Sequence, residues 1–365
     1  GATLGYELAR RGVGVLILDK ARLPRYKACA GGITVRTARL LDFDVESVAQ
    51  RVVYGVRVVY KGKKEFTRWY DKPLIYTVMR DEFDYFLVKR AEEAGAVMAG
   101  EEKVCRVVAS GSGVEVETSD GVFRADIVAG ADGASGVVAS SLGLARGIQL
   151  GMGMETEVSV PHEELAKWDS LMGLDLGNVR GGYGWVFPKK DHLSVGMGCP
   201  MRQVRKLKRS YQKVLSSHQL EECETTRLRS HLLPVARKGV AIQSDRGLLL
   251  GDAAGLLDPL TGEGIYYAIR SAQIAAPIIG QSLQDRTVDL GGYQRAVDRE
   301  IMSELKSARA LARVFTWFPG LFFNGVEGSN SLWNASCRLL RGEESYISLK
   351  RKLGVFQFAF DLLSR

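Results

Sequence analysis

The most constraining feature of this sequence is a glycine-rich stretch that covers residues 247–269. It opens with residues 248–250, an apolar run that predicts a short buried strand. Asp252 follows at the carboxyl end of that strand, which is where open α/β sheets bind their ligands. The pattern therefore places the Asp252 carboxylate to accept a hydrogen bond from a ribose or ribityl hydroxyl.

The second half of the stretch is a glycine turn that leads into a predicted helix. Gly262 and Gly264 stand just before Ile265, where the helical pattern begins. Glycines let backbone N–H groups approach an anion, and a helix N-terminus favours negative charge. These residues predict a turn that binds a phosphate or a ring edge. The alternative is a purely structural strand, Asp-Pro turn and helix, which would have the same residue pattern.

The start of the chain predicts part of a dinucleotide-binding unit. Residues 1–12 have a helical pattern that ends at a glycine, and residues 13–18 form an apolar strand closed by Asp19. In a βαβ unit of this kind the acid holds a ribose hydroxyl, and Gly1 would be the last glycine of Gly-x-Gly-x-x-Gly. The first strand and two glycines would then precede this sequence, which would make it a fragment or a chain that begins late. A chance helix–strand pair is the alternative.

Three further positions are candidates for contact with a bound ligand. Residues 23–33 contain a glycine pair that suits backbone packed against a flat molecule, and Cys29 beside it either faces that molecule or is a small buried residue. Arg80 opens a predicted amphipathic helix, where it either reaches a phosphate or ring edge or is solvated. Asp132 lies in a glycine turn after a strand, and this segment alone favours a structural Asp-Gly turn.

Two parts of the chain are rich in strand patterns. Residues 51–79 alternate apolar and polar side chains, and residues 148–200 contain a predicted hairpin over residues 183–198. Tyr183 and Trp185 stand two residues apart in that hairpin, so they share one face of its first strand. Neighbouring glycines leave space beside them. These aromatic residues belong either to the core or to the wall of an apolar groove.

Helical patterns dominate the chain after the central stretch, over residues 265–284 and 290–315. Residues 315–323 form an aromatic segment that is broken by Pro and Gly and is too short to span a bilayer. This segment contacts lipid, closes over an apolar substrate or, as the pattern favours, packs in the core. Residues 340–365 give no pattern that can be assigned.

Composition narrows the cellular setting and the partners. The five cysteines show no metal-ligand spacing, which predicts no metal site and favours free thiols in a reducing compartment such as the cytoplasm. The net charge of +8 at pH 7 predicts attraction to anionic ligands or to an anionic membrane surface, so peripheral membrane contact stays open. Basic residues are dispersed along the chain, which argues against nucleic acid as a partner. No signal peptide or membrane-spanning apolar run is visible.

These features occur in an order that resembles a known group of flavoproteins. The unit ending at Asp19, the helix opening at Arg80, the turn at Asp132 and the glycine-rich stretch together resemble FAD-binding proteins of the para-hydroxybenzoate hydroxylase type. Two stretches, residues 24–33 and residues 183–188, narrow the resemblance to the geranylgeranyl reductase family.

The resemblance, which covers residues 1 to about 290, implies an α/β fold in three parts. These are a Rossmann-like FAD-binding domain, an inserted antiparallel β-sheet domain for the substrate, and a C-terminal helical region. By this comparison the FAD-binding domain comprises residues 1–50, 80–145 and 235–290, the substrate domain residues 51–79 and 146–234, and the helical region residues 291–365.

The same resemblance assigns roles to individual residues. Tyr183, Trp185 and Phe187 match an aromatic motif that lines the substrate cavity. Cys29, Tyr183 and an ordered water are the candidate proton donors. Ala30 is a departure from the pattern, because many relatives have glycine there. The residues assigned to FAD are Gly1, Asp19, Ala30, Gly31, Ile33, Arg80, Val104, Asp132, Asp252, Gly262, Gly264 and Ile265.

The function that the resemblance implies is the FAD-dependent reduction of isoprenoid double bonds in a lipid, chlorophyll or quinone precursor. The reductant would be NADPH or ferredoxin. FAD would supply the redox chemistry and the protein the placement of the reactants. An isolated trisubstituted alkene is a poor hydride acceptor, so a proton must reach its less substituted carbon. We therefore expect a dry apolar tunnel that ends at the flavin beside one proton donor.

Three other functions on related scaffolds stay open. An aromatic hydroxylase or halogenase needs oxygen at the reduced flavin, and the halogenase motif Trp-x-Trp-x-Ile-Pro is replaced here by Tyr-Gly-Trp-Val-Phe-Pro. An electron-transfer flavoprotein–quinone oxidoreductase needs a four-cysteine iron–sulfur module, whereas Cys337 is the only cysteine after Cys223. The third is a lipid-binding relative that has lost its cofactor.

Overall fold

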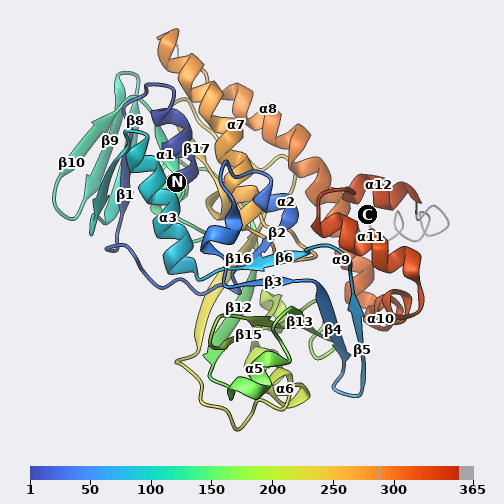
Figure 1. Ribbon diagram of the computed structural model, residues 1–365. Coiled ribbons are helices and arrows are strands. Elements are labelled where there is room, and N and C mark those ends of the chain that lie inside the picture. The colour runs from blue at the N-terminus through green and yellow to red at the C-terminus, as the bar shows by residue number, and fades with distance from the viewer. Residues whose placement is uncertain (287, 353–365) are drawn as a thin grey trace.

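The computed structural model describes residues 1–286 and 288–352, whose arrangement is shown in Figure 1. The upper part of the view carries two parallel strand pairs with helices packed over them, and the lower part carries a seven-stranded sheet. The C-terminal helices lie at one side of the molecule. This arrangement confirms the α/β fold class, whereas the division into three domains stays a prediction.

The two parallel strand pairs come from the segments that were expected to bind a dinucleotide. Their elements are α1 (Ala2–Ala9), β1 (Leu16–Asp19), α3 (Arg80–Glu93), β7 (Val97–Gly100), β11 (Val128–Gly130), α4 (Val137–Ser141), β17 (Gly247–Leu249) and α7 (Ile265–Gln284). β1 runs parallel to β7, and β11 runs parallel to β17. Parallel pairing needs a crossover connection, and α3 lies in the one between β1 and β7.

The core of this part lies between α1, α7 and β17. Leu248 and Leu249 are fully buried, which confirms the buried strand that their apolar run predicted. Leu4 of α1 and Tyr267 of α7 belong to the same buried cluster. Because these helices and this strand share one apolar core, the turn that follows β17 is held in a fixed position at its edge.

Two small antiparallel sheets flank the strand pairs. Their elements are β2 (Gly32–Thr34), α2 (Val35–Ala38), β3 (Arg51–Val53), β6 (Ile75–Thr77), β8 (Val104–Ser110), β9 (Gly113–Thr118) and β10 (Val122–Ala125), in the orders β2-β6-β3 and β10-β9-β8. Residues 121–128 do not form one strand. β10 pairs with β9, whereas β11 pairs with β17, so the chain changes sheets between Ala125 and Val128.

The seven-stranded sheet has the order β16-β12-β15-β14-β13-β4-β5. Its elements and the helices near it are β4 (Gly55–Tyr60), β5 (Lys64–Trp69), β12 (Gln149–Val158), α5 (His162–Ala166), β13 (Leu171–Leu176), β14 (Tyr183–Pro188), β15 (Leu193–Pro200), α6 (Val204–Ser217) and β16 (Arg229–Val235). β14 and β15 form the predicted hairpin. Leu207 and Val214 of α6 pack into the same buried cluster as Val195 of β15, which covers one face of the sheet.

Five helices follow α7 in the described part of the chain: α8 (Gly291–Glu300), α9 (Met302–Trp317), α10 (Pro319–Gly328), α11 (Asn330–Leu340) and α12 (Tyr346–Lys352). The prediction of one helix over residues 290–315 was wrong, because the chain breaks at Ile301. The Ser303 hydroxyl donates to the Asp298 carbonyl at 3.1 Å, which takes up an acceptor of the ending helix. Among the described residues, no helix has both the length and the apolar character needed to cross a bilayer.

Candidate functional site

The segment before β2 packs tightly against the backbone of Val78, which lies two residues before the start of α3. Gly31 has a φ of +66°, and a Cβ at this position would overlap the carbonyl oxygen of Val78. The N–H of Val78 donates to the Gly31 carbonyl at 2.8 Å. Only glycine fits such a backbone approach with positive φ. Ala30 and Gly31 therefore present a flat strip of backbone, and Ile33 is fully buried behind it.

Lys189 holds this strip in place through two hydrogen bonds. The sequence had indicated only a hairpin at this position. Nζ of Lys189 donates to the carbonyls of Ala30 at 2.7 Å and Val78 at 2.8 Å. The side chain is 2% exposed. Burial lowers the pKa of Lys189 to about 8, because a charged ammonium loses its hydration there. Its position directly after Pro188 was the one signal that could have drawn attention to it.

Cys29 lies beside a buried carboxylate that sequence reasoning also missed. The Cys29 N–H donates to Oε1 of Glu155, and the Cys29 Sγ accepts from the Gly31 N–H at 3.4 Å. Within the described residues, Oε2 of Glu155 is buried and has no hydrogen-bond partner. Burial raises the pKa of Glu155 to about 7. The available signal was the pair of acids, Glu155 and Glu157, in an otherwise uncharged strand pattern.

Two cations complete what we call the Cys29 pocket, which consists of Lys27, Cys29, Arg80, Glu155 and Lys189. Arg80 is the first residue of α3 and donates from Nε and Nη2 to Asp84 at 2.9 and 3.0 Å. The charge of Arg80, together with burial, lowers the pKa of Lys27. Two cations held so close together fit an anionic ligand such as a diphosphate.

The residues expected at the ribose and diphosphate lie around these cations. Asp19 ends β1, where its carboxylate accepts from the Ala21 N–H at 2.9 Å and from Arg25 at 3.3 Å. Gly1 precedes α1 and caps the N-terminus of that helix. The structure therefore brings these predicted residues to one place, at the carboxyl end of β1 and the N-terminus of α1.

The glycine-rich stretch forms a turn between β17 and α7. Asp252 lies in a 3-10 helix, Gly251–Ala254, and its Oδ1 would be 3.1 Å from a Cβ added to Gly264. Burial raises the pKa of Asp252, and Lys27 opposes this shift. Gly264 precedes Ile265, the first residue of α7, so the predicted turn and helix start are confirmed. Because Gly264 carries no side chain, Asp252 and Leu257 can pack closely against the backbone of this turn.

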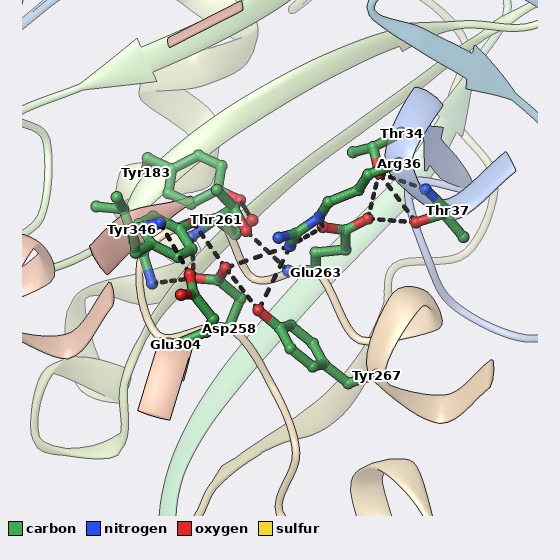
Figure 2. A network of polar contacts seen from close by, with 11 residues as sticks. Thr34, Arg36, Thr37, Tyr183, Asp258, Thr261, Glu263, Tyr267, Glu304 and Tyr346 are labelled. Carbon is green, nitrogen blue, oxygen red and sulfur yellow. Dashed lines mark hydrogen bonds and ion pairs between the residues drawn. The ribbon is translucent and has the colours of Figure 1, made fainter. Parts of the chain in front are cut away.

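A set of buried polar residues holds residues 258–264 of this turn, and Figure 2 shows it. We call it the loop network; its members are Thr34, Arg36, Thr37, Asp258, Glu263, Tyr267 and Tyr346. Glu263 Oε1 accepts from the hydroxyls of Thr34 at 2.6 Å and Thr37 at 2.7 Å. Its Oε2 accepts from Arg36 Nε at 2.9 Å and from Nη2 of the same side chain.

Asp258 is the second carboxylate of the loop network and is fully buried. Its Oδ1 accepts from the backbone N–H of Leu260 at 2.8 Å and of Thr261 at 3.1 Å, which closes the turn. Its Oδ2 accepts from the Tyr346 hydroxyl at 2.7 Å. Arg36 lies 3.6 Å from the same oxygen. A residue of α12 therefore helps to hold the turn, which no local sequence pattern indicated.

The three aromatic residues of β14 face the same turn and the strip at residues 30–32. Tyr183 donates its hydroxyl to the Thr261 carbonyl, and this hydroxyl would lie 3.2 Å from a Cβ on Gly262. Phe187 would contact a Cβ on Gly32 at 3.1 Å. Trp185 lies between them on the same face of the strand and is largely buried. The structure thus brings the predicted substrate residues against both predicted cofactor segments.

Two of the predicted cofactor residues occupy other positions. Asp132 accepts from the backbone N–H of Val138 at 3.0 Å, which ties the turn after β11 to the first residues of α4. This is the structural Asp-Gly turn that the segment by itself favoured. Val104 is the first residue of β8 in the flanking three-stranded sheet. Their roles towards a cofactor stay predictions.

Comparison with known proteins decides the family. A family model described as "FAD binding domain" matches residues 1–290. The chain belongs to the FAD binding domain family. As a member of this family it takes FAD as its cofactor, and the fit of its residues agrees. Lys27 and Arg80 place two positive charges beside each other, which suits a diphosphate, and the segments at Gly31 and Gly264 carry no side chains of their own at these positions.

Individual relatives of this chain agree with the resemblance drawn from the sequence. An uncharacterized protein of Methanosarcina barkeri is 31% identical, with 89% of this chain and 84% of that protein covered. Digeranylgeranylglycerophospholipid reductase of Methanocaldococcus jannaschii is 28% identical, with 78% and 75% covered. A geranylgeranyl bacteriochlorophyll reductase-like structure from Thermoplasma acidophilum has a TM-score of 0.73 at 22% identity, with 86% and 85% covered, which shows the shared fold. The resemblance to geranylgeranyl reductases is therefore confirmed.

Proposed function

We propose that this protein reduces carbon–carbon double bonds of a geranylgeranyl-type isoprenoid chain in a lipid, chlorophyll or quinone precursor. One observation carries the proposal: the aromatic face of β14 lies against both glycine segments assigned to FAD. Tyr183 contacts the turn at Thr261, and Phe187 lies beside Gly32. An apolar chain that followed this face would meet the flavin position between the two segments. The names of the related reductases support the same class of substrate.

Each part of the site has a task in this proposal. FAD, when bound, supplies the reducing equivalents. Lys27 and Arg80 neutralise its diphosphate, and Asp19 and Asp252 accept hydrogen bonds from ribose and ribityl hydroxyls. The N-terminus of α7 at Gly264 directs backbone N–H groups at the ring edge. The loop network keeps that helix start in place while substrate enters and leaves.

The alkene also needs a proton, and we assign Cys29 rather than Tyr183 as its donor. The hydroxyl hydrogen of Tyr183 is held by the Thr261 carbonyl. Burial also raises the pKa of Tyr183, which makes it a weaker acid. Tyr183 then positions the turn and excludes water, while the Cys29 thiol faces the pocket that it shares with Arg80 and Glu155.

The proposal includes the partners of the reaction. The substrate is an isoprenoid or polyprenyl lipid, and such a molecule resides in a bilayer, so the protein makes peripheral contact with a membrane. The two electron donors to compare are NADPH and reduced ferredoxin. Supply of each donor separately to the oxidised protein, with the loss of flavin absorbance recorded, distinguishes them.

The proposal is tested by reducing the purified flavoprotein with dithionite and adding geranylgeranyl diphosphate without oxygen. We expect the absorbance of oxidised flavin to return and a more saturated product to form. Flavin that is reoxidised only by oxygen would contradict the proposal and favour an aromatic hydroxylase. A protein that retains no flavin would favour the cofactor-free lipid-binding relative.

Two variants test the assignment of the proton donor. Cys29→Ala should slow reoxidation by isoprenoid about 100-fold, since general acid catalysis contributes at least about this much. Tyr183→Phe should slow it less than about 10-fold, because it removes a positioning contact. FAD content and the visible spectrum of both variants serve as controls for the site itself. A Cys29→Ala protein with unchanged reoxidation would remove Cys29 as the donor.

A further inference from the structure

The end of α9 and the start of α10 expose four large apolar side chains within six residues. We call this patch the α9–α10 corner: Trp317, Phe318, Leu321 and Phe322, which are 57, 54, 55 and 39% exposed. Exposed apolar side chains scattered singly are normal, whereas a contiguous group of aromatic residues marks an interaction surface. We propose that the α9–α10 corner docks on the anionic surface of a lipid bilayer and that the isoprenoid substrate enters there.

The corner is mounted rigidly on the molecule. Pro319 is the first residue of α10, so α9 ends and the chain turns before it. The opposite face of α10 is buried, because Phe323 packs on the rings of Tyr60 and Phe66 at centroid distances of 5.4 and 5.0 Å. Figure 1 shows α10 at the edge of the molecule, away from the β8–β10 sheet. The outward side chains of the corner therefore belong to packed helices.

Basic residues lie near the corner, and they favour an anionic partner. The Arg180 guanidinium lies 3.5 Å from the centre of the Trp317 ring. Arg313 precedes Trp317 by one turn of α9, and Lys61 lies over Tyr60, whose hydroxyl is close to Gly320. Aromatic side chains at the depth of the headgroups with cations beside them are the arrangement that binds an anionic membrane surface. A second copy of this chain would bring the same positive charges against one another.

Apolar side chains continue from the corner to the candidate site. The ring of Phe322 packs edge-on against that of Phe315 at a centroid distance of 5.5 Å. Phe315 in turn packs against the buried cluster that contains Trp185 and Phe187, with Tyr183 at its margin. An isoprenoid chain that left a bilayer at the corner would therefore meet apolar side chains along its path to the aromatic face of β14. This step rests on the proposed function, whereas the docking itself does not.

Docking is tested with the purified flavoprotein and sedimented vesicles of two compositions, phosphatidylcholine alone and phosphatidylcholine with phosphatidylglycerol. We expect binding to the anionic vesicles, weakened by high salt, and at least tenfold weaker binding by the variant with Trp317→Ser and Phe318→Ser. Val122→Ser is the matched control, because Val122 is 58% exposed on β10, away from the corner. Arg180→Gln should weaken binding to the anionic vesicles only.

Two results would overturn the docking proposal. One is equal vesicle binding by the wild type and the corner variant. The other is a wild type that does not bind vesicles and whose oligomeric state, measured by sedimentation velocity, changes when the corner is mutated. The occupant of the corner would then be a second copy of this chain.

Turnover separates this proposal from the proposed function. The corner variant should reduce dissolved geranylgeranyl diphosphate as the wild type does, yet lose activity on an isoprenoid lipid held in vesicles. Vesicle binding without any isoprenoid reduction by the wild type would leave the docking intact and reject the reductase function.

Discussion

Two groups of charged residues belong to the candidate site, and they are built in different ways. In the loop network every carboxylate oxygen has partners. Glu263 is bound by two threonine hydroxyls and one guanidinium. Asp258 is bound by two backbone N–H groups and a tyrosine hydroxyl, and the same guanidinium lies beside it. In the Cys29 pocket, Oε2 of Glu155 is buried without a partner among the described residues. Lys189 donates to backbone carbonyls.

The difference shows which group is scaffold and which can respond to a ligand. Charges that are fully hydrogen-bonded in a low-dielectric interior hold one geometry and are costly to break. Groups whose charge is only partly compensated favour their neutral forms. Burial accordingly raises the pKa of Glu155 to about 7 and lowers the pKa of Lys189 to about 8. Such groups gather where protons or ions are exchanged. We therefore expect mutations in the two groups to differ in size and in pH dependence.

The largest effect is expected from Glu263→Ala in the loop network. This change leaves the Arg36 guanidinium, which is 14% exposed, without its main partner. Breaking a buried ion pair from one side costs about 3–5 kcal/mol in the free energy of unfolding. Denaturant unfolding measures this loss, and Glu263→Gln, which keeps the shape and one acceptor, should lose less. A cost below about 1 kcal/mol for the alanine variant would mean that the loop network is not a rigid scaffold.

At neutral and higher pH, Glu155→Gln in the Cys29 pocket should raise the free energy of unfolding instead of lowering it. A carboxyl whose pKa rises from 4.5 to about 7 on folding costs stability progressively as the pH increases between these values. A pKa raised this far corresponds to about 3 kcal/mol in the free energy of unfolding. The glutamine variant should therefore gain about this much over the wild type between pH 4 and pH 8. Unfolding curves at a series of pH values check it, and a difference that is independent of pH would contradict the idea of a partly compensated pocket.

Tyr346→Phe should cost less than Glu263→Ala, because Asp258 keeps its other partners. Hydrogen bonds to a charged group contribute about 1.5–3 kcal/mol, and we expect the lower end of that range. Tyr267→Phe is the matched control, since the Tyr267 hydroxyl lies 3.5 Å from the same oxygen, against 2.7 Å for Tyr346. Equal losses for the two variants, measured by urea unfolding, would show that the contact from α12 has no special importance.

The sequence was sufficient for those parts of the site that depend on local patterns. The apolar run before Asp252 formed the buried strand, and the glycines before Ile265 formed the turn at the start of α7. The alternation of Tyr183 and Trp185 placed them on one face of β14. Periodicity and turn chemistry are properties of neighbouring residues, so a single sequence contains them.

The contacts that join distant segments could not be predicted in this way. Arg36 and Glu263 are 227 positions apart, and Lys189 and Ala30 are 159 positions apart. Arginine and lysine are usually surface residues, so the local sequence gives no sign that Arg36 and Lys189 are buried. Only the tertiary fold buries them. The break at Ile301 was missed for a related reason, because Ser303 acts through a hydrogen bond that leaves the helical periodicity of the sequence intact.

The smallest effect is expected from Arg124→Ala on β10, which provides a matched surface pair for the comparison. Arg124 Nε donates to Glu115 Oε1 at 2.9 Å, the same distance as between Arg36 Nε and Glu263 Oε2. The side chains of the surface pair are 81 and 50% exposed. Exposed pairs contribute about 0–1 kcal/mol, and 1 M salt screens them. The loss from Arg124→Ala should therefore be small and vanish in salt, while the loss from Glu263→Ala should persist. Because the hydrogen-bond length is equal in the two pairs, a difference between them measures the effect of burial and of the surrounding network, whereas equal losses would mean that the geometry of the pair alone sets its strength.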